Sequence, residues 1–140
     1  KSWILGYTTI YYPKTFIFHK LGATSKKMNQ ISINYHSLKN RISALIKNLE
    51  FKNLFLILPT HIIILIFIGT FYLIRFEFSK ATMVFSAIYW NIIHLTKLLS
   101  ERKKIQKLRV LSDDEIFKRV GKSWPIGEML SHFRKVEENY

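Results

Sequence analysis

Residues 53–74 are an uncharged apolar stretch that constrains the fold more than any other part of the chain. The stretch holds no Lys, Arg, Asp or Glu, and Lys52 and Arg75 flank it. A helix of this length extends roughly 33 Å, about the thickness of the hydrocarbon core of a bilayer. A helix in a soluble protein normally keeps a polar side. The stretch therefore predicts a transmembrane helix, in which Pro59 predicts a kink or a late start.

The composition agrees with a membrane protein that carries separate apolar and basic blocks. The 140 residues are 49% hydrophobic, yet 22 Lys and Arg against 9 Asp and Glu give a net charge of +13. Such an excess predicts an anionic partner, such as lipid headgroups, nucleic acid or a phosphorylated ligand. The lack of cysteine excludes disulfides and thiolate metal sites. Because the sequence starts at Lys1 and no signal peptide opens it, we expect further chain upstream.

Two different patterns precede the apolar stretch. Residues 8–12 and 15–18 are β-branched and aromatic and are separated by Pro13, so they predict two short strands at the edge of a larger sheet. Residues 31–52 then predict an amphipathic helix. Its apolar side chains recur at helical spacing, as Ile31, Tyr35, Leu38, Ile42, Leu45 and Leu49. This helix suits either the membrane surface or packing against another domain.

A second apolar segment follows the short polar connector at residues 75–80. Residues 81–95 lack formal charge but include Asn91 and His94, and extension to Leu99 gives a length sufficient to cross a membrane. We therefore predict a hairpin of two spans, 53–74 and 81–99, with an interfacial helix at 81–99 as the alternative. Basic residues are concentrated before the first span and after the second, which places both termini in the cytoplasm of a multi-pass protein of the cell membrane.

The tail at residues 100–140 is basic and has helical patterns. Ser112 and Glu115 form a capping-box pattern that predicts a short helix, with Gly121 to end it, and Pro125 starts another. We expect cationic side chains on both sides of the apolar segments to lie at a surface of anionic lipid, namely Lys39, Arg41, Lys47, Arg102, Lys103 and Lys104. The same chemistry could bind nucleic acid, but basic clusters beside a membrane segment favour lipid, so no nucleic-acid partner is expected.

The sequence contains few groups that suggest catalysis. Asp113, Asp114 and Glu115 could bind a metal, but the capping box already accounts for this cluster. The histidines lack zinc-ligand spacing, and neither a phosphate-binding glycine loop nor a nucleophile elbow is present. His61 is the only titratable group within residues 53–74, and its position near Pro59 favours an interfacial place over a chemical role.

A series of short motifs resembles the end of the catalytic domain in family 2 glycosyltransferases. In order, these are Trp3-x-x-Gly6-Tyr7, Tyr12-Pro13-Lys14 and His19-x-x-Gly22-Ala23-x-Ser25. Tyr35 followed by Asn40-Arg41 resembles the helix that the family places before a membrane hairpin, although Lys39 stands where Arg is usual. The tail, with Arg102 and Lys103 before the Ser-Asp-Asp-Glu sequence, is also similar.

The resemblance implies a nucleotide-sugar-dependent transferase with a GT-A catalytic domain on the cytoplasmic face of the membrane. Residues 1–30 would be the edge of that domain, and the nucleotide-binding and catalytic residues would lie upstream. The family's implied divalent metal, Mn or Mg, would have His19 as a ligand, whereas the same His could simply cap a strand. The implied partners are a nucleotide-sugar donor and a lipid or glycan acceptor.

The expected fold class is thus a mainly α membrane protein with four parts. These are a short β segment within residues 1–30, an amphipathic helix over 31–52, a transmembrane hairpin over 53–99 and a helical tail over 100–140. The expected function is membrane anchoring of a glycosyltransferase, inactive without its catalytic domain and needing no cofactor of its own. The alternative is a self-standing two-span membrane protein that binds anionic lipid or a partner protein.

Overall fold

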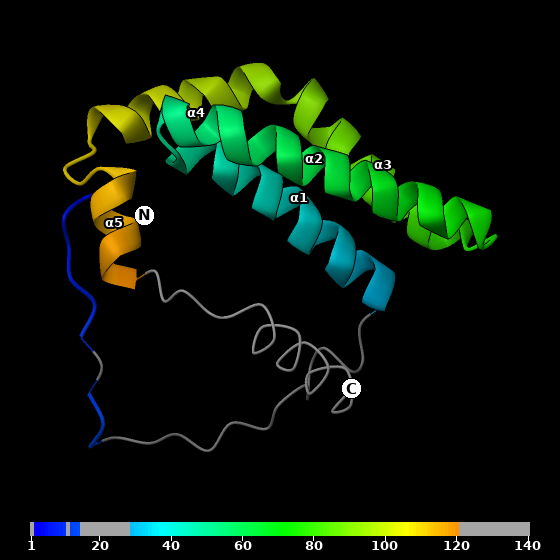
Figure 1. Cartoon of the computed structure of the whole chain (residues 1–140), viewed down its shortest axis with the longest axis horizontal. Helices are drawn as coiled ribbons and strands as arrows, with labels where there is room; N and C mark the ends of the chain where they lie inside the picture. The colour runs from blue at the N-terminus through cyan, green and yellow to red at the C-terminus, as the bar shows by residue number, and fades with distance from the viewer. Residues whose placement is uncertain (1, 11, 15–28, 121–140) are drawn as a thin grey trace.

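The computed structural model describes residues 2–10, 12–14 and 29–120, and the regular structure of these residues is α-helical (Figure 1). The helices are α1 (Gln30–Asn48), α2 (Phe51–Ile74), α3 (Phe78–Ile93), α4 (Leu95–Lys107) and α5 (Asp113–Val120).

Helix α1 confirms an amphipathic helix in this region, but it ends at Asn48, before the predicted end at residue 52. The side chain of Asn29 caps its first turn by accepting a hydrogen bond of 2.9 Å from the backbone N–H of Ile31. Ile42 and Ile46 are 2% and 5% exposed, and Ile31, Tyr35 and Leu38 pack against the same core. The helix buries one side because its apolar residues recur at helical spacing, and its other side stays exposed.

Helix α2 contains the apolar stretch and starts two residues earlier than predicted, at Phe51. It continues through Pro59, so the alternative of a late helix start at this proline is wrong. Leu65 and Gly69 are buried on its inner side, and Gly69 brings the helix against the ring of Phe85 in α3.

The predicted two-span hairpin is wrong, because the second segment is not one membrane-length helix. Helix α3 has 16 residues and ends at Ile93, and α4 begins at Leu95. At His94, between the two helices, the imidazole lies 2.9 Å from the Trp90 carbonyl and stacks on the Trp90 ring. The 16-residue helix α3 therefore extends about 24 Å, less than the thickness of the hydrocarbon core of a bilayer.

Helix α3 also serves as the centre of the molecule, where it contacts both α1 and α2. The core between them includes Ile42, Ile46, Leu65, Val84 and Leu98. A polar contact lies within this core: the Ser43 hydroxyl donates to the Asn91 side chain at 2.7 Å, and the Asn91 amide donates to the Lys39 carbonyl at 3.1 Å. Asn91 is therefore used for helix packing, although it was predicted to lie in a membrane span.

The predicted N-terminal β segment is also wrong within the described residues. Residues 2–6 form turns, and residues 7–10 and 12 have no regular structure. Ile10 is 84% exposed, and this segment pairs with no strand among the described residues. The second predicted strand, at residues 15–18, lies outside the described residues.

Instead, the N-terminal turn contacts the connector between α4 and α5. The Ile4 carbonyl accepts hydrogen bonds from the backbone N–H groups of Val110 at 2.7 Å and Leu111 at 3.3 Å. Gly6 closes the turn at a φ of 79°, and a Cβ there would lie 3.2 Å from Val110. The Trp3-x-x-Gly6 motif thus needs glycine for both backbone conformation and close approach.

The capping box at the start of α5 is confirmed. The Ser112 backbone N–H donates to the Glu115 carboxylate at 2.8 Å, and the Glu115 N–H donates to the Ser112 hydroxyl at 3.2 Å. Gly121, the predicted end of this helix, and the helix predicted from Pro125 lie outside the described residues.

Candidate membrane interface

The outward half of α2 is apolar along nearly its whole length. We call it the outer face, and its side chains are 42% to 74% exposed. They are Phe55, Leu56, Ile63, Ile64, Ile66, Phe67, Phe71, Leu73 and Ile74. Among the described helices, α2 is the one long and apolar enough to cross a membrane, and only 17% of its most apolar window is buried. Water would solvate such a face poorly, whereas lipid would cover it.

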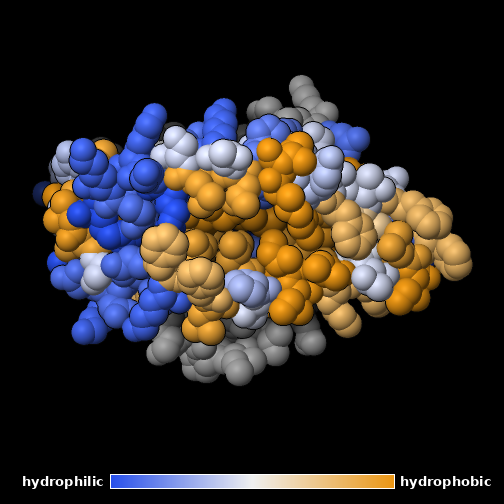
Figure 2. Space-filling view, turned by 90° about the horizontal axis from the view of Figure 1, so that it is seen from above, coloured by the Kyte–Doolittle hydropathy of each residue, from blue (hydrophilic) through white to orange (hydrophobic). Residues whose placement is uncertain are grey.

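The outer face continues onto neighbouring helices and then gives way to charge. Tyr89, Ile92 and Ile93 of α3 and Leu95 and Leu99 of α4 are also exposed. Figure 2 shows apolar side chains gathered over the middle of the molecule and one of its ends, with hydrophilic side chains at the end where α4 and α5 meet. An apolar surface bordered by charge at one end is typical of a protein held at a membrane.

The exposed side of α1 is polar, in contrast to the outer face. Its exposed residues include Asn34, His36, Ser37, Asn40 and Arg41. In Figure 1, α1 lies below the other long helices. Figure 2 is seen from above, so it shows the side of the molecule opposite α1. The molecule thus has an apolar side and a polar side.

The structure places the predicted cationic residues of α1 in three different environments. Arg41 is exposed. Lys39 is partly exposed, and its ammonium lies 4.7 Å from the ring centroid of Trp90. Lys47 forms a salt bridge of 3.1 Å with Glu101, with 22% of its side chain exposed. Of the three, Arg41 has the most accessible charge.

The predicted cations of α4 separate into one buried and two exposed side chains. Lys103 and Lys104 are exposed and remain candidates for headgroup contact. Arg102 is only 4% exposed, and its guanidinium donates at 2.6 Å to each of the carbonyls of Ile46 and Leu49. Arg102 is therefore not placed at a lipid surface, because its donors are used to close the C-terminal end of α1.

This contact is part of a polar clasp, made by Arg102, Gln106, Arg109 and Asp113, around the turn between α1 and α2. The Gln106 amide donates to the Lys47 carbonyl at 3.1 Å, and Arg109 donates to the Asn48 carbonyl. Arg109 also pairs with Asp113 at 3.0 Å. The clasp satisfies the free carbonyls at the end of α1, which otherwise lack helical partners.

Asp113 links the clasp to the start of α2. Its carboxylate accepts from the Glu50 backbone N–H at 2.7 Å and from the Asn53 amide at 3.0 Å, and its own N–H donates to the Glu50 carboxylate. This role of Asp113 was not predicted from the sequence. The available signal was the spacing of Arg102 and Gln106, which places both on one side of a helix.

Burial and the neighbouring charges shift the pKa of the Arg102 guanidinium. Desolvation lowers the pKa of its guanidinium, Arg109 lowers it further, and Asp113 raises it. An arginine starts from so high a pKa that it stays protonated at neutral pH. Arg102 therefore acts as a charged hydrogen-bond donor inside the protein.

The predicted metal ligand does not fall within the described part of the chain. His19 lies outside it, and among the described residues no three His, Asp or Glu side chains are grouped to hold a metal. His61 lies on the inner side of α2, where its Nε2 is buried and makes no hydrogen bond to a described residue.

Comparison with known proteins adds no assignment to this geometry. No family model, no curated protein and no solved structure matches this chain. The resemblance to family 2 glycosyltransferases therefore stays a prediction from short motifs.

Proposed function

We propose that the described helices form a membrane-attachment module in which the outer face of α2 lies in lipid. The observation that supports this proposal is the exposure of nine large apolar side chains of α2 between Phe55 and Ile74. The polar side of α1 faces water or headgroups, and Lys103 and Lys104 lie at the level of lipid phosphates. The excess of basic residues beside the apolar segments supports a cytoplasmic location for this polar side.

Membrane extraction of a triple variant tests this attachment. In the full chain, Phe55, Ile63 and Phe67 are each replaced by Ser; each buried apolar side chain contributes about 2 kcal/mol. We expect the variant to leave membranes at alkaline pH, under which the original chain stays bound. Replacement of Tyr7, Ile10 and Tyr12 by Ser is the matched control, since these residues are exposed but outside α2. Retention of the α2 variant would overturn the proposal.

We propose that this module belongs to a nucleotide-sugar-dependent glycosyltransferase that acts at the cytoplasmic face of the membrane. The ordered motifs from Trp3 to Ser25 support this proposal. The contact of Ile4 with the α4–α5 connector is consistent with it, because it would hold the end of an upstream domain beside the cationic end of the module. The donor, acceptor and divalent metal follow from the resemblance alone.

A transfer assay with the complete gene product in membranes tests this activity. We expect sugar from a nucleotide-sugar donor to appear in a lipid or glycan product, with Mn or Mg required. His19→Ala should lower turnover and raise the metal concentration needed for half-maximal rate, without loss of membrane binding. Absence of transfer from every common donor, with membrane attachment intact, would favour a self-standing membrane protein instead.

A further inference from the structure

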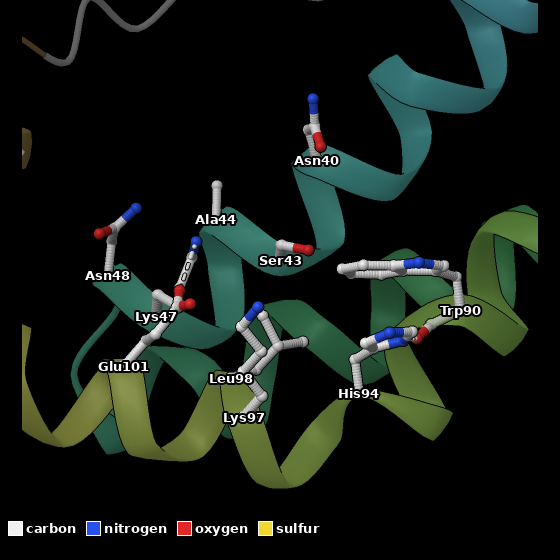
Figure 3. A pocket seen from close by; sticks show the side chains of 10 residues that line it. All are labelled: Asn40, Ser43, Ala44, Lys47, Asn48, Trp90, His94, Lys97, Leu98 and Glu101. Atoms are coloured by element: carbon white, nitrogen blue, oxygen red, sulfur yellow. Dashed lines mark hydrogen bonds and ion pairs between the residues drawn. The ribbon is translucent and has the colours of Figure 1, made fainter.

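A cleft of about 310 Å³ lies between α1 and the α3–α4 segment, apart from the outer face of α2. Asn40 and Lys47 line it from α1, and Trp90, His94, Lys97 and Glu101 line it from the other side (Figure 3). Neither the membrane attachment nor the proposed sugar transfer uses this cleft. Its charges and hydrogen-bonding groups indicate what it can bind.

Positive charge predominates in and beside the cleft. Lys47 is held at one end by its salt bridge of 3.1 Å with Glu101. Lys97 is exposed and forms no ion pair with any described residue, and Figure 3 shows its ammonium directed into the space between the Lys47–Glu101 pair and the Trp90–His94 stack. Lys39 lies above the Trp90 ring at 4.7 Å. Among the described residues, the ammonium groups of Lys47 and Lys97 and the carboxylate of Glu101 thus line the cleft.

His94 adds a hydrogen-bonding group whose orientation is fixed. Its ring stacks on Trp90 with centroids 4.0 Å apart, and its Nδ1 lies 2.9 Å from the Trp90 carbonyl. In the tautomer that donates from Nδ1 to this carbonyl, Nε2 remains as an acceptor. A phosphate ester that carries one proton can donate its O–H to this acceptor.

We propose that this cleft binds a single phosphate ester group. The tetrahedral oxygens of a phosphate accept hydrogen bonds from several directions, which suits the ammonium donors of Lys47 and Lys97 on opposite walls. The ester is either a soluble metabolite or the headgroup of a phospholipid.

Calorimetric titration of the full chain in a neutral detergent tests this proposal. The ligands are glycerol 3-phosphate as the soluble ester, short-chain phosphatidic acid as the lipid ester, and glycerol as the ligand without phosphate. We expect at least one ester to bind and glycerol to give no binding. Lys97→Gln should weaken ester binding at least about tenfold, because it removes the unpaired cation.

Lys107→Gln is the matched control, with the same charge change on the same helix but outside the cleft. It should change affinity by less than about twofold, through screened charge alone. Binding of glycerol 3-phosphate identifies a soluble ester, and binding of phosphatidic acid alone identifies a headgroup. Failure of both to bind, or equal effects of the two lysine variants, would overturn the proposal whether or not α2 lies in lipid.

Discussion

Arg102 is a buried cation that joins α4 to the end of α1. Its two hydrogen bonds of 2.6 Å reach carbonyls that no helical N–H can satisfy, and the guanidinium also lies over the Phe51 ring at 4.4 Å. From sequence, Arg102 looked the same as the adjacent Lys103 and Lys104. Only the neighbouring helix distinguishes them, because burial of one position in a basic run depends on which side of α4 packs inward.

Replacement of Arg102 by Leu should destabilise the fold by about 3 kcal/mol, because two buried carbonyls lose charged donors. Chemical denaturation of the full chain in detergent, followed by circular dichroism, measures this loss. Lys103→Leu, at the exposed neighbouring position, should change the unfolding free energy by less than about 0.5 kcal/mol. Similar effects of the two substitutions would contradict the assigned role of Arg102.

The stability of the first turn of α5 depends on pH through the carboxylate of Glu115. Hydrogen bonds from the Ser112 hydroxyl and backbone N–H lower the pKa of its carboxyl below the ordinary value of 4.5. Because the folded state favours the charged form, the capping box contributes fully above that value and is lost as the pH falls through the lowered pKa.

Amide exchange at Ile116 and Phe117 measures this contribution. Protection factors should stay constant above pH 4.5 and fall as the pH decreases further, as the carboxylate becomes protonated. In Glu115→Gln the protection should be nearly independent of pH over the same range. An equal fall in both proteins would show that α5 does not depend on this carboxylate.

At the scale of elements, the closeness of α2 and α3 depends on Gly69. A Cβ at this position would lie 2.7 Å from the end of the Phe85 ring, closer than real contacts allow. Gly69→Val should therefore destabilise the helix pair by about 2 kcal/mol through overpacking. Thermal unfolding in detergent measures the effect. Phe85→Leu in the same chain should restore part of the loss; failure to restore any would mean that the ring is not the obstacle.

The long helices differ in how far sequence alone could define them. The period of apolar residues predicted α1, and the uncharged run predicted α2 to within two residues at its start. The break at His94 was missed, because hydropathy does not report how an imidazole stacks on Trp90 or that Asn91 pairs with Ser43. The strand prediction failed for a related reason: β-branched residues favour a strand only where a partner strand exists.

At the scale of the whole molecule, the separation of an apolar side from a polar side explains the composition. A chain that is both 49% hydrophobic and charged by +13 can keep the two kinds of side chain apart by exposing the polar side of α1 and the outer face of α2. The sequence predicted attachment to a membrane through residues 53–74. It could not predict that α1 would pack alongside α3 and α4, because that arrangement depends on the Ser43–Asn91 contact and the clasp around Leu49.

Depth measurement by spin labels tests the central claim, that the outer face of α2 lies in lipid while the polar side of α1 lies in water. The chain has no cysteine, so single cysteines at Ile63 and Asn40 label one site each. In bilayer vesicles, the label at Ile63 should collide mainly with oxygen, and the label at Asn40 mainly with a water-soluble nickel chelate. If both labels show the same preference, whether for lipid or for water, the two-sided arrangement is contradicted.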